Sequence, residues 1–259
     1  MTRLGVVGDI HARWTPDDIA ALDDRGLDGL LFTGDLGDVL HRGVPPIARA
    51  IGRLRTPAVV VPGNHDGPSP LGVLREALGI PHPPGSTRRL LARTRALAAE
   101  LAPVPLGGFS VHSFGPTSVV VGRPWSMGGW GFGRAVRARH GITDLDHSAQ
   151  RIGHLLRQAP GQHLVLLAHN GPAGRGHRPD APWAVGSHGD IGDVDLERAI
   201  AQADSRLRVV AAGHVHHGRR RHWHVEHEGV HYLNAARVRR GWFVEVRLGT
   251  TTEVRAIGA

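Results

Sequence analysis

The sequence predicts an α/β fold built on a largely parallel β-sheet, and two observations support this. Three short apolar runs, each bounded by glycine, have the length and composition of buried strands: 4–9, 29–35 and 58–64. Amphipathic segments separate these runs, as they do in the crossover units of parallel sheets. With 259 residues the chain is long enough to bury a sizeable core, and we predict a single domain over residues 1–259.

The remaining elements follow in order, without an internal repeat. Thr15 before Pro16 is typical of a helix N-cap, and Ile47, Ile51 and Leu54 recur at helical spacing. After a proline-rich break at 81–86 we expect a helix reaching Leu101, then a hairpin formed by 109–115 and 117–124. A helix over 146–158, strands in 163–170 and 207–217, and an antiparallel tail complete the prediction.

The composition argues against a thiolate metal site and a membrane-spanning protein, but it says little about nucleic-acid binding. There is no cysteine, so a metal site must use His, Asp, Asn or Glu, and no apolar run approaches the roughly 20 residues that cross a bilayer. The amino terminus lacks the pattern of a signal peptide, and we expect a cytoplasmic protein without membrane association. The net charge of +8 comes entirely from arginine. A solvated arginine-rich surface explains it, so a nucleic-acid partner is not favoured, although 218–224 combines arginine with tryptophan.

Polar side chains follow five of the apolar runs, always at the same end. The residues are Asp9 and His11; Asp35 and Asp38; Asn64, His65 and Asp66; His169; and His214 and His216. The carboxyl ends of parallel strands meet at one edge of a sheet, so we expect these side chains to converge. Carboxylate, imidazole and amide donors suit Mn, Fe, Co, Ni or Zn. A single Asp, His or Asn at such a place is commonly a helix cap, a surface residue or a turn former. These ordinary roles do not easily explain polar residues at the ends of five successive apolar runs.

These segments carry a resemblance to a known family. The set GDIH (8–11), GDLGD (34–38), GNHD (63–66), His169 in LLAHNGP and GHVH (213–216) resembles the five motifs of calcineurin-like metallophosphoesterases. Segments 122–129, 168–176 and 187–190 also look like a little-characterised bacterial and plant subgroup. The resemblance implies a four-layer αββα sandwich with two mixed β-sheets.

The resemblance also implies a set of ligands for two divalent metal ions. We expect these ions to be Mn2+. The first metal would be held by Asp9, His11, Asp35 and His216, and the second by Asp35 as a bridge together with Asn64, His169 and His214. Asp38 matches a position that is usually not a ligand. Two metals about 3.5–4 Å apart can share a hydroxide that attacks a phosphoester.

Two neighbouring residues complete the predicted catalytic group. His65 has no place in the ligand set, so it can protonate the leaving oxygen or stabilise charge in the transition state. Asp66 either orients His65 or caps a turn. The amide NH2 of Asn64 would face the phosphate.

Segments 81–135 and 171–192 are predicted to rim the site. Their arginines Arg123 and Arg175 would hold a phosphate, because guanidinium binds phosphate bidentately. Whether Trp125, Trp130 and Trp183 stack on the substrate or anchor these loops in the core stays open. We expect a small phosphodiester or a nucleotide phosphate as substrate. The alternatives are a phosphomonoesterase or protein phosphatase, and a non-catalytic scaffold or nucleic-acid-binding protein.

Overall fold

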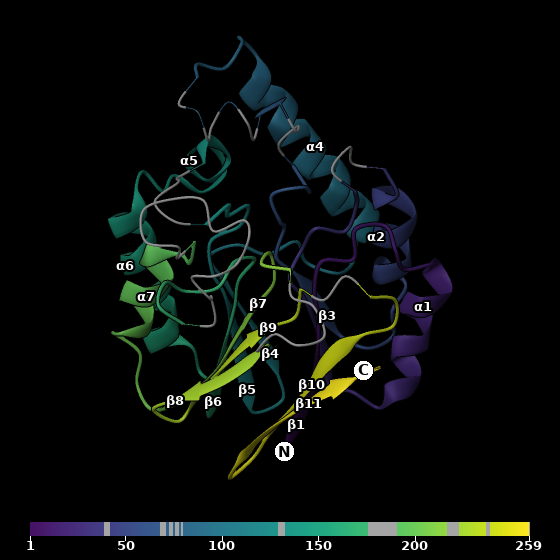
Figure 1. Cartoon of the computed structure of the whole chain (residues 1–259), viewed down its shortest axis with the longest axis vertical. Helices are drawn as coiled ribbons and strands as arrows, with labels where there is room; N and C mark the ends of the chain where they lie inside the picture. The colour runs from purple at the N-terminus through teal and green to yellow at the C-terminus, as the bar shows by residue number, and fades with distance from the viewer. Residues whose placement is uncertain are drawn as a thin grey trace.

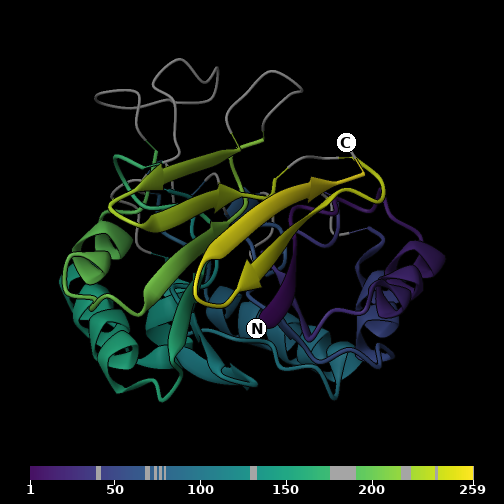
Figure 2. The ribbon, with the colours of Figure 1, turned by 90° about the horizontal axis from the view of Figure 1, so that it is seen from below.

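The computed structural model shows two mixed β-sheets packed face to face, with helices on both outer sides (Figure 1). It describes residues 1–38, 42–67, 71–72, 75, 78, 80–128, 133–175, 191–216, 223–236 and 239–258. Turned by 90°, the molecule shows its helices on two opposite flanks, with the strands between them (Figure 2). The predicted four-layer αββα architecture is confirmed. In the described part of the chain, no helix combines the length and apolar character needed to cross a membrane.

The first sheet has the strand order β11-β10-β1-β2-β3. Its strands are β1 (Thr2–Val7), β2 (Gly29–Phe32), β3 (Ala58–Val60), β10 (Phe243–Leu248) and β11 (Thr252–Ile257). The strands β1, β2 and β3 are parallel, whereas β10 and β11 add an antiparallel edge. The helices α1 (Pro16–Ala20), η1 (Ala21–Arg25) and α2 (Val44–Gly52) cover its outer face.

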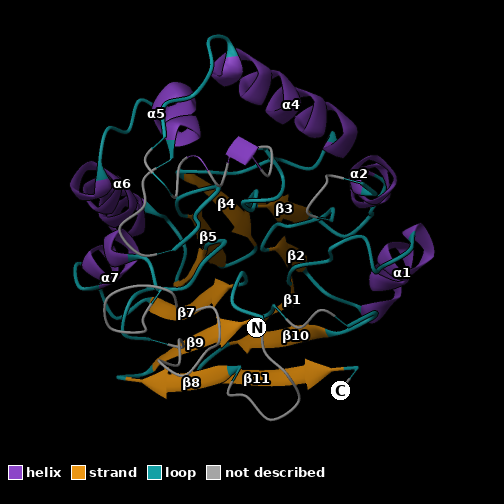
Figure 3. Cartoon of the chain, turned by 45° about the horizontal axis from the view of Figure 1, so that its top comes forward, coloured by secondary structure: helices purple, strands orange, loops and turns teal. Residues whose placement is uncertain are grey.

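The second sheet has the order β4-β5-β6-β7-β9-β8. Its strands are β4 (Ser110–Phe114), β5 (Thr117–Val121), β6 (His163–Leu167), β7 (Leu207–Ala212), β8 (His224–His227) and β9 (Val230–Asn234). Its central strands are parallel, and the hairpins β4–β5 and β8–β9 are antiparallel. The helices α5 (Arg134–His140), α6 (Leu145–Gln158) and α7 (Val194–Ile200) cover the other flank (Figure 3).

Strand side chains alternate between two apolar layers. On β1, for example, Leu4 and Val6 face the core between the sheets, whereas Val7 packs under the helices. Because β5, β6 and β7 alternate in the same way, these strands are buried on both faces and read as continuous apolar runs. Each fully buried Val or Leu contributes about 1.5–3 kcal/mol relative to an exposed one.

The helix α4 (Ser86–Leu101) joins the two outer layers. Its residues Leu97 and Leu101 pack in the layer over the first sheet, whereas Leu90 packs with Trp125 in the layer over the second sheet. The helix also packs against α5 at the top of Figure 1. The helix therefore bridges the two outer layers, with its amino-terminal half over the second sheet and its carboxyl-terminal half over the first.

Most predicted elements are present, with local differences. Thr15 forms a capping box with Asp18 at the start of α1, and the hairpin and the helix over 146–158 are found as predicted. Segment 81–135, predicted as a rim, consists largely of α4 and the β4–β5 hairpin and is part of the scaffold. The helix α5 was not predicted, because its arginine-rich sequence has only two buried positions.

The tryptophans that can be placed pack in or against the apolar core, although Trp223 is only partly buried. Trp125 is 5% exposed and belongs to the layer under α5 and α6, so it is a core anchor. Trp223 packs against the core between the sheets, with its ring 6.2 Å from that of Trp242. Trp130, Trp183 and residues 218–222 of the arginine-rich run lie outside the described residues.

A buried ion-pair network joins the loop after β5 to the start of α7. Arg123 Nε and Nη2 donate to Asp195 at 2.9 and 3.1 Å, and Nη2 lies 2.9 Å from Asp193 Oδ1. Ser148 donates to Asp195 and Ser126 donates to Asp193. Burial alone would lower the pKa of Arg123, but the two carboxylates hold it above its usual value.

This network corrects the predicted role of Arg123. The side chain is 1% exposed, and its guanidinium is occupied by two carboxylates. It therefore cannot reach a phosphate in the active-site opening. Its charge stabilises the junction between the loop after β5 and α7.

We predict that Arg123→Ala lowers the free energy of unfolding by about 3–5 kcal/mol, because it leaves two buried carboxylates without their cation. Urea unfolding followed by tryptophan fluorescence measures this. The control is Arg88→Ala, at an exposed position on α4, which should change stability by no more than about 0.5 kcal/mol. A loss of less than 1 kcal/mol in Arg123→Ala would contradict the structural role.

Candidate metal centre

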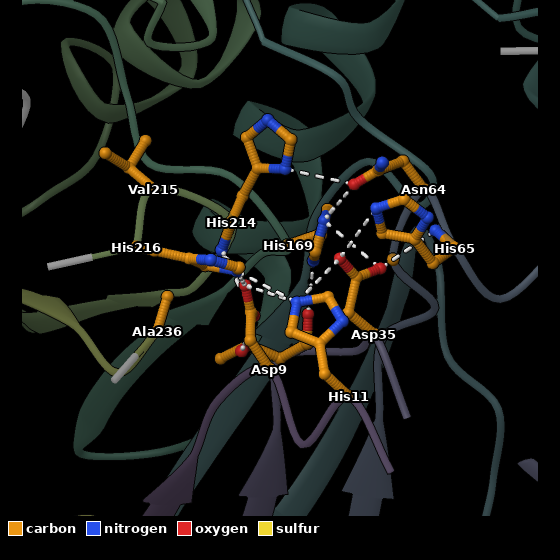
Figure 4. A network of polar contacts seen from close by, with 12 residues as sticks. Asp9, His11, Asp35, Asn64, His65, His169, His214, Val215, His216 and Ala236 are labelled. Carbon is orange, nitrogen blue, oxygen red and sulfur yellow. Dashed lines mark hydrogen bonds and ion pairs between the residues drawn. The ribbon is translucent and has the colours of Figure 1, made fainter. Parts of the chain in front are cut away.

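The loops that follow five strands bring seven of the predicted side chains into one cluster (Figure 4). The strands are β1, β2 and β3 of the first sheet and β6 and β7 of the second. The side chains form two groups: Asp9, His11 and His216; and Asp35, His169 and His214, with Asn64 beside the second group. Within each three-residue group, the candidate ligand atoms all lie within 4.8 Å of one another.

The first group directs nitrogen and oxygen lone pairs at one point. His216 Nε2 lies 2.9 Å from His11 Nε2 and 3.1 Å from Asp9 Oδ2. The other ring nitrogen of His11, Nδ1, lies 3.2 Å from the carbonyl oxygen of Gly37, which can only accept. The neutral ring therefore carries its proton on Nδ1 and presents Nε2 to the cluster. Such a backbone contact is the usual way in which a metal-binding histidine is oriented.

The second group shows the same arrangement more clearly. His169 Nδ1 lies 2.6 Å from the carbonyl oxygen of Thr33, which fixes the proton on that nitrogen. Its Nε2 lies 2.8 Å from Asn64 Oδ1, and His214 Nδ1 lies 3.0 Å from the same oxygen. Burial lowers the pKa of His169, so the ring is neutral and two acceptor atoms face each other. A cation bound by both atoms relieves this repulsion, so the donor set fits a divalent metal.

Asp35 lies between the two groups. Its Oδ2 is 3.8 Å from His11 Nε2, and its Oδ1 is 3.7 Å from His169 Nε2. Ligand atoms at 2.0–2.2 Å from one metal are about 3–4 Å apart. The carboxylate therefore has one oxygen within reach of each candidate metal position.

The two buried carboxylates differ in their electrostatics. Burial raises the pKa of Asp35 well above its usual value, and the charges of Asp9 and Asp66 raise it further. Burial also acts to raise the pKa of Asp9, but the hydrogen bond with His216 and the nearby histidines outweigh this and lower it to about 2. Without cations, the cluster thus disfavours two ionised carboxylates.

Backbone strain is concentrated at the candidate ligands. Asp9, His11, Asp35 and His214 have φ angles of 42°, 45°, 52° and 67°, all in the left-handed region. Non-glycine residues rarely adopt this conformation, which costs on the order of 1–3 kcal/mol at each position. Such strain is typical of functional sites, where the surrounding structure holds it in place.

Two motif glycines are required by close packing around the cluster. A Cβ atom on Gly63 would lie 2.2 Å from Asp35 Oδ1 and 2.6 Å from His169 Cε1. A Cβ atom on Gly213 would lie 2.4 Å from Asp9 Oδ1. Both glycines therefore let the backbone approach the carboxylates more closely than any side chain would allow.

His65 lies at the edge of the cluster. Its backbone N donates to Asp35 Oδ1 at 2.9 Å, and its Nε2 is 3.9 Å from Asp35 Oδ2. The ring meets that of His11 edge-on, with centroids 5.6 Å apart, and 23% of the side chain is exposed. His65 is thus placed between the candidate metals and the solvent.

Asp66 has the turn-stabilising role that the sequence left open. Its Oδ2 accepts hydrogen bonds from the backbone N of Asp35 and Gly63, and its Oδ1 accepts one from Leu36 N. Both carboxylate oxygens thus bind backbone of the loops after β2 and β3. These contacts do not support a direct role in orienting the His65 ring.

The other predicted residues lie outside the cluster. Asp38 forms an ion pair with Arg42. Arg175 is exposed and lies beside Tyr232 of β9, where it lines a cavity of about 610 Å3 next to α7 and the β8–β9 turn. Burial raises the pKa of Tyr232, and Arg175 partly offsets this through its charge and a hydrogen bond. Among the described residues, no contact joins Arg175 to the candidate metal centre, so its predicted substrate contact lacks support.

Sequence reasoning missed the groups that orient the ligands. The carbonyl oxygens of Thr33 and Gly37 fix the tautomers of His169 and His11, and the side chain of Asn170 ties the loop after His169 to Ile191 O. Backbone carbonyls leave no signal in residue type. Only their position, Gly37 within the GDLGD motif and Thr33 directly before it, could have pointed to them.

Comparisons with known proteins agree with this geometry. The family model for calcineurin-like phosphoesterases matches residues 2–218, whereas no curated protein sequence matches the chain. A dimetal phosphatase from Danio rerio has a similar structure, with a TM-score of 0.62 and 11% identity over 98% of this chain and 95% of that one.

Two further structures share the fold at low identity. GAP50, described as the anchor in the inner membrane complex of Plasmodium, has a TM-score of 0.51 and 8% identity over 99% of this chain and 84% of that one. The NAD nucleotidase of Haemophilus influenzae has a TM-score of 0.50 and 10% identity over 98% of this chain and 49% of that one. At these identities, the likeness shows the fold alone.

The family match covers most of the chain, and the described geometry places two candidate metal-binding groups where the family motifs lie. The chain therefore belongs to the calcineurin-like phosphoesterase family and is a metallophosphoesterase, a hydrolase of phosphoric esters.

Proposed function

We propose that the cluster holds two divalent cations, preferentially Mn2+, and that the enzyme hydrolyses small phosphodiesters or nucleotide phosphates. The observation that carries the metal part is the position of Asp35, with one oxygen facing each group of donors. The first cation would be held by Asp9, His11, Asp35 and His216, and the second by Asp35, Asn64, His169 and His214. Oxygen and imidazole donors without thiols support Mn2+, with Fe, Co, Ni and Zn as alternatives.

When bound, two cations supply activation of a water molecule and neutralise charge on the phosphoryl group. The protein residues contribute orientation and a proton. Hydrogen bonds to Thr33 and Gly37 hold His169 and His11 in the tautomer that leaves Nε2 free to bind. His65 lies beside Asp35 with part of its ring exposed, where it can donate a proton to the leaving oxygen.

The preference for a diester follows from charge. Arg123 is bound to Asp193 and Asp195, and Arg175 lies against Tyr232, so neither predicted guanidinium supports a doubly charged monoester at the centre. A diester carries one negative charge, whereas a monoester carries up to two, so two cations can neutralise a diester without help from a guanidinium. A nucleic-acid partner is not favoured. We also propose that the enzyme is located in the cytoplasm.

Two other functions fit parts of the structure. A phosphomonoesterase or protein phosphatase would use the same metal cluster. A non-catalytic scaffold would share the fold, as GAP50 does, but the complete donor set argues against it. Measurements of bound metal and of substrate preference distinguish these functions from the proposed one.

We expect Asp35→Ala to abolish turnover and to remove most of the bound metal, because the variant loses the carboxylate proposed to bridge both cations. Elemental analysis of the purified protein measures the metal. The matched control is Asp38→Ala, which removes a carboxylate three residues away that pairs with Arg42. Two metals retained in Asp35→Ala, with near-normal turnover, would refute the bridging role.

His65→Gln should keep both metals and slow turnover by roughly 10²–10⁴-fold, the usual contribution of a positioned acid. A substrate with a very acidic leaving group should be slowed less, since it needs little protonation. His154→Gln, at an exposed position on α6, serves as the control. Loss of metal in His65→Gln would instead identify His65 as a ligand.

The enzyme loaded with Mn2+ should hydrolyse bis(p-nitrophenyl) phosphate faster than p-nitrophenyl phosphate at equal concentration, for the charge reason given above. Chelation with EDTA should abolish both reactions, and added Mn2+ should restore them. A fully metallated enzyme that prefers the monoester would reject the diester preference and leave the metal assignment in place.

A further inference from the structure

A small cavity lined by arginines lies beside the loop that carries His65. It has a volume of about 140 Å3, and Gly67 forms part of its wall. Gly67 is two positions after His65, so their Cα atoms are no more than about 7 Å apart. The cationic lining consists of Arg75, Arg89, Arg93 and Arg134.

Arg75, Arg89 and Arg93 gather in this cavity without an acidic residue in its described lining. Arg89 and Arg93 lie one turn apart on the exposed face of α4, where like charges repel. In the described part of the chain, no ion pair joins Arg75, Arg89 or Arg93 to an acidic residue. By contrast, ion pairs with Asp or Glu are formed by Arg3, Arg42, Arg49, Arg55, Arg206 and Arg240.

Two of the four arginines are held in place. Arg75 Nε donates to the carbonyl oxygen of Pro81 at 3.0 Å, and Arg134 donates to the hydroxyl of Ser86, another lining residue. The first turn of α4 contains no acidic residue. A bound anion would therefore meet fixed cationic groups and would relieve the repulsion between Arg89 and Arg93.

The cavity is tied to the catalytic loop by packing. A Cβ atom on Gly67 would lie 2.8 Å from Trp125 Nε1 and 3.2 Å from Leu90 Cδ1, so the loop sits directly on the core. Leu90 also lines the cavity and is 3% exposed. The hydrogen bonds that Asp66 accepts from Asp35, Gly63 and Leu36 hold this loop against the one after β2. The position of the cavity relative to His65 is therefore fixed.

We propose that this cavity binds a second, non-reacting phosphate group of the substrate while the reacting phosphoester lies at the metal centre. This inference rests on the proposed function and narrows its substrate class to small molecules with two phosphate groups a few atoms apart. Pockets that enclose a whole ligand measure about 300–1,000 Å3. A cavity of 140 Å3 suits one phosphate group, which guanidinium can bind bidentately.

Calorimetric titration of the Mn2+-loaded protein tests this with two ligands that cannot be hydrolysed. Butane-1,4-bisphosphonate carries two anionic groups, and butylphosphonate carries one on the same chain. The wild type should bind the bisphosphonate at least about tenfold more tightly. In Arg89→Ala and in Arg93→Ala, the Kd of the bisphosphonate should rise by about tenfold, and that of butylphosphonate by less than about twofold.

The controls are Arg88→Ala and Arg95→Ala, which remove exposed arginines of α4 that do not line the cavity. They should leave both Kd values unchanged. Equal weakening of the two ligands, or the same effect in the controls, would show general surface charge and overturn the proposal. So would a wild type that does not prefer the bisphosphonate. Binding is measured without turnover, whereas absence of bis(p-nitrophenyl) phosphate hydrolysis by the wild type would count against the proposed function alone.

Discussion

Two buried carboxylates, Asp9 and Asp35, impose the constraint on which the rest of the site depends. Each is about 1% exposed, and like charges in an apolar interior are costly unless cations or donors compensate them. The nearest donors belong to the backbone of His214 and His65. The histidines add further contacts, and backbone carbonyls orient two of them, His11 and His169. A divalent cation bound there would supply the missing positive charge, and because it would bind only the folded chain, it would stabilise the fold.

The same constraint explains why the motifs pair glycine with a ligand. Asp9, Asp35 and His214 all have positive φ angles, so the chain turns sharply as it leaves each strand. The neighbouring Gly63 and Gly213 let a second backbone segment pass within van der Waals contact of the carboxylates. Strain at the ligands is thus offset by the sheet below, whose strands are buried on both faces. The strands fix where each loop begins, and the glycines fix how closely the loops meet.

The sequence predicted the cluster because its information is local. A strand followed at once by Asp, Asn or His places that residue at the carboxyl edge, and the parallel connections β1–β2–β3 and β6–β7 bring the edges together. Arg123 could not be placed in this way. Its partners Asp193 and Asp195 lie some 70 residues away, and the choice between a carboxylate and a phosphate depends on a tertiary contact. The two predicted roles of Asp66 could not be separated for the same reason, since the backbone atoms that it binds include those of another loop.

The arginine content shows how little a net charge says about function. Thirty-one basic residues against 23 acidic ones give +8, but the structure sorts arginines by their partners. Arg123 is neutralised inside the protein, whereas Arg206 is bound by Asp204 at the surface. Arg89 and Arg93 on α4 contrast with these, because they line a cavity next to the loop that carries His65 and its described lining contains no acidic residue. Local imbalance of charge, rather than its sum, therefore indicates where an anionic group of the substrate would bind. Because α4 packs in both outer layers, that imbalance is held at a fixed place beside the loop that carries His65.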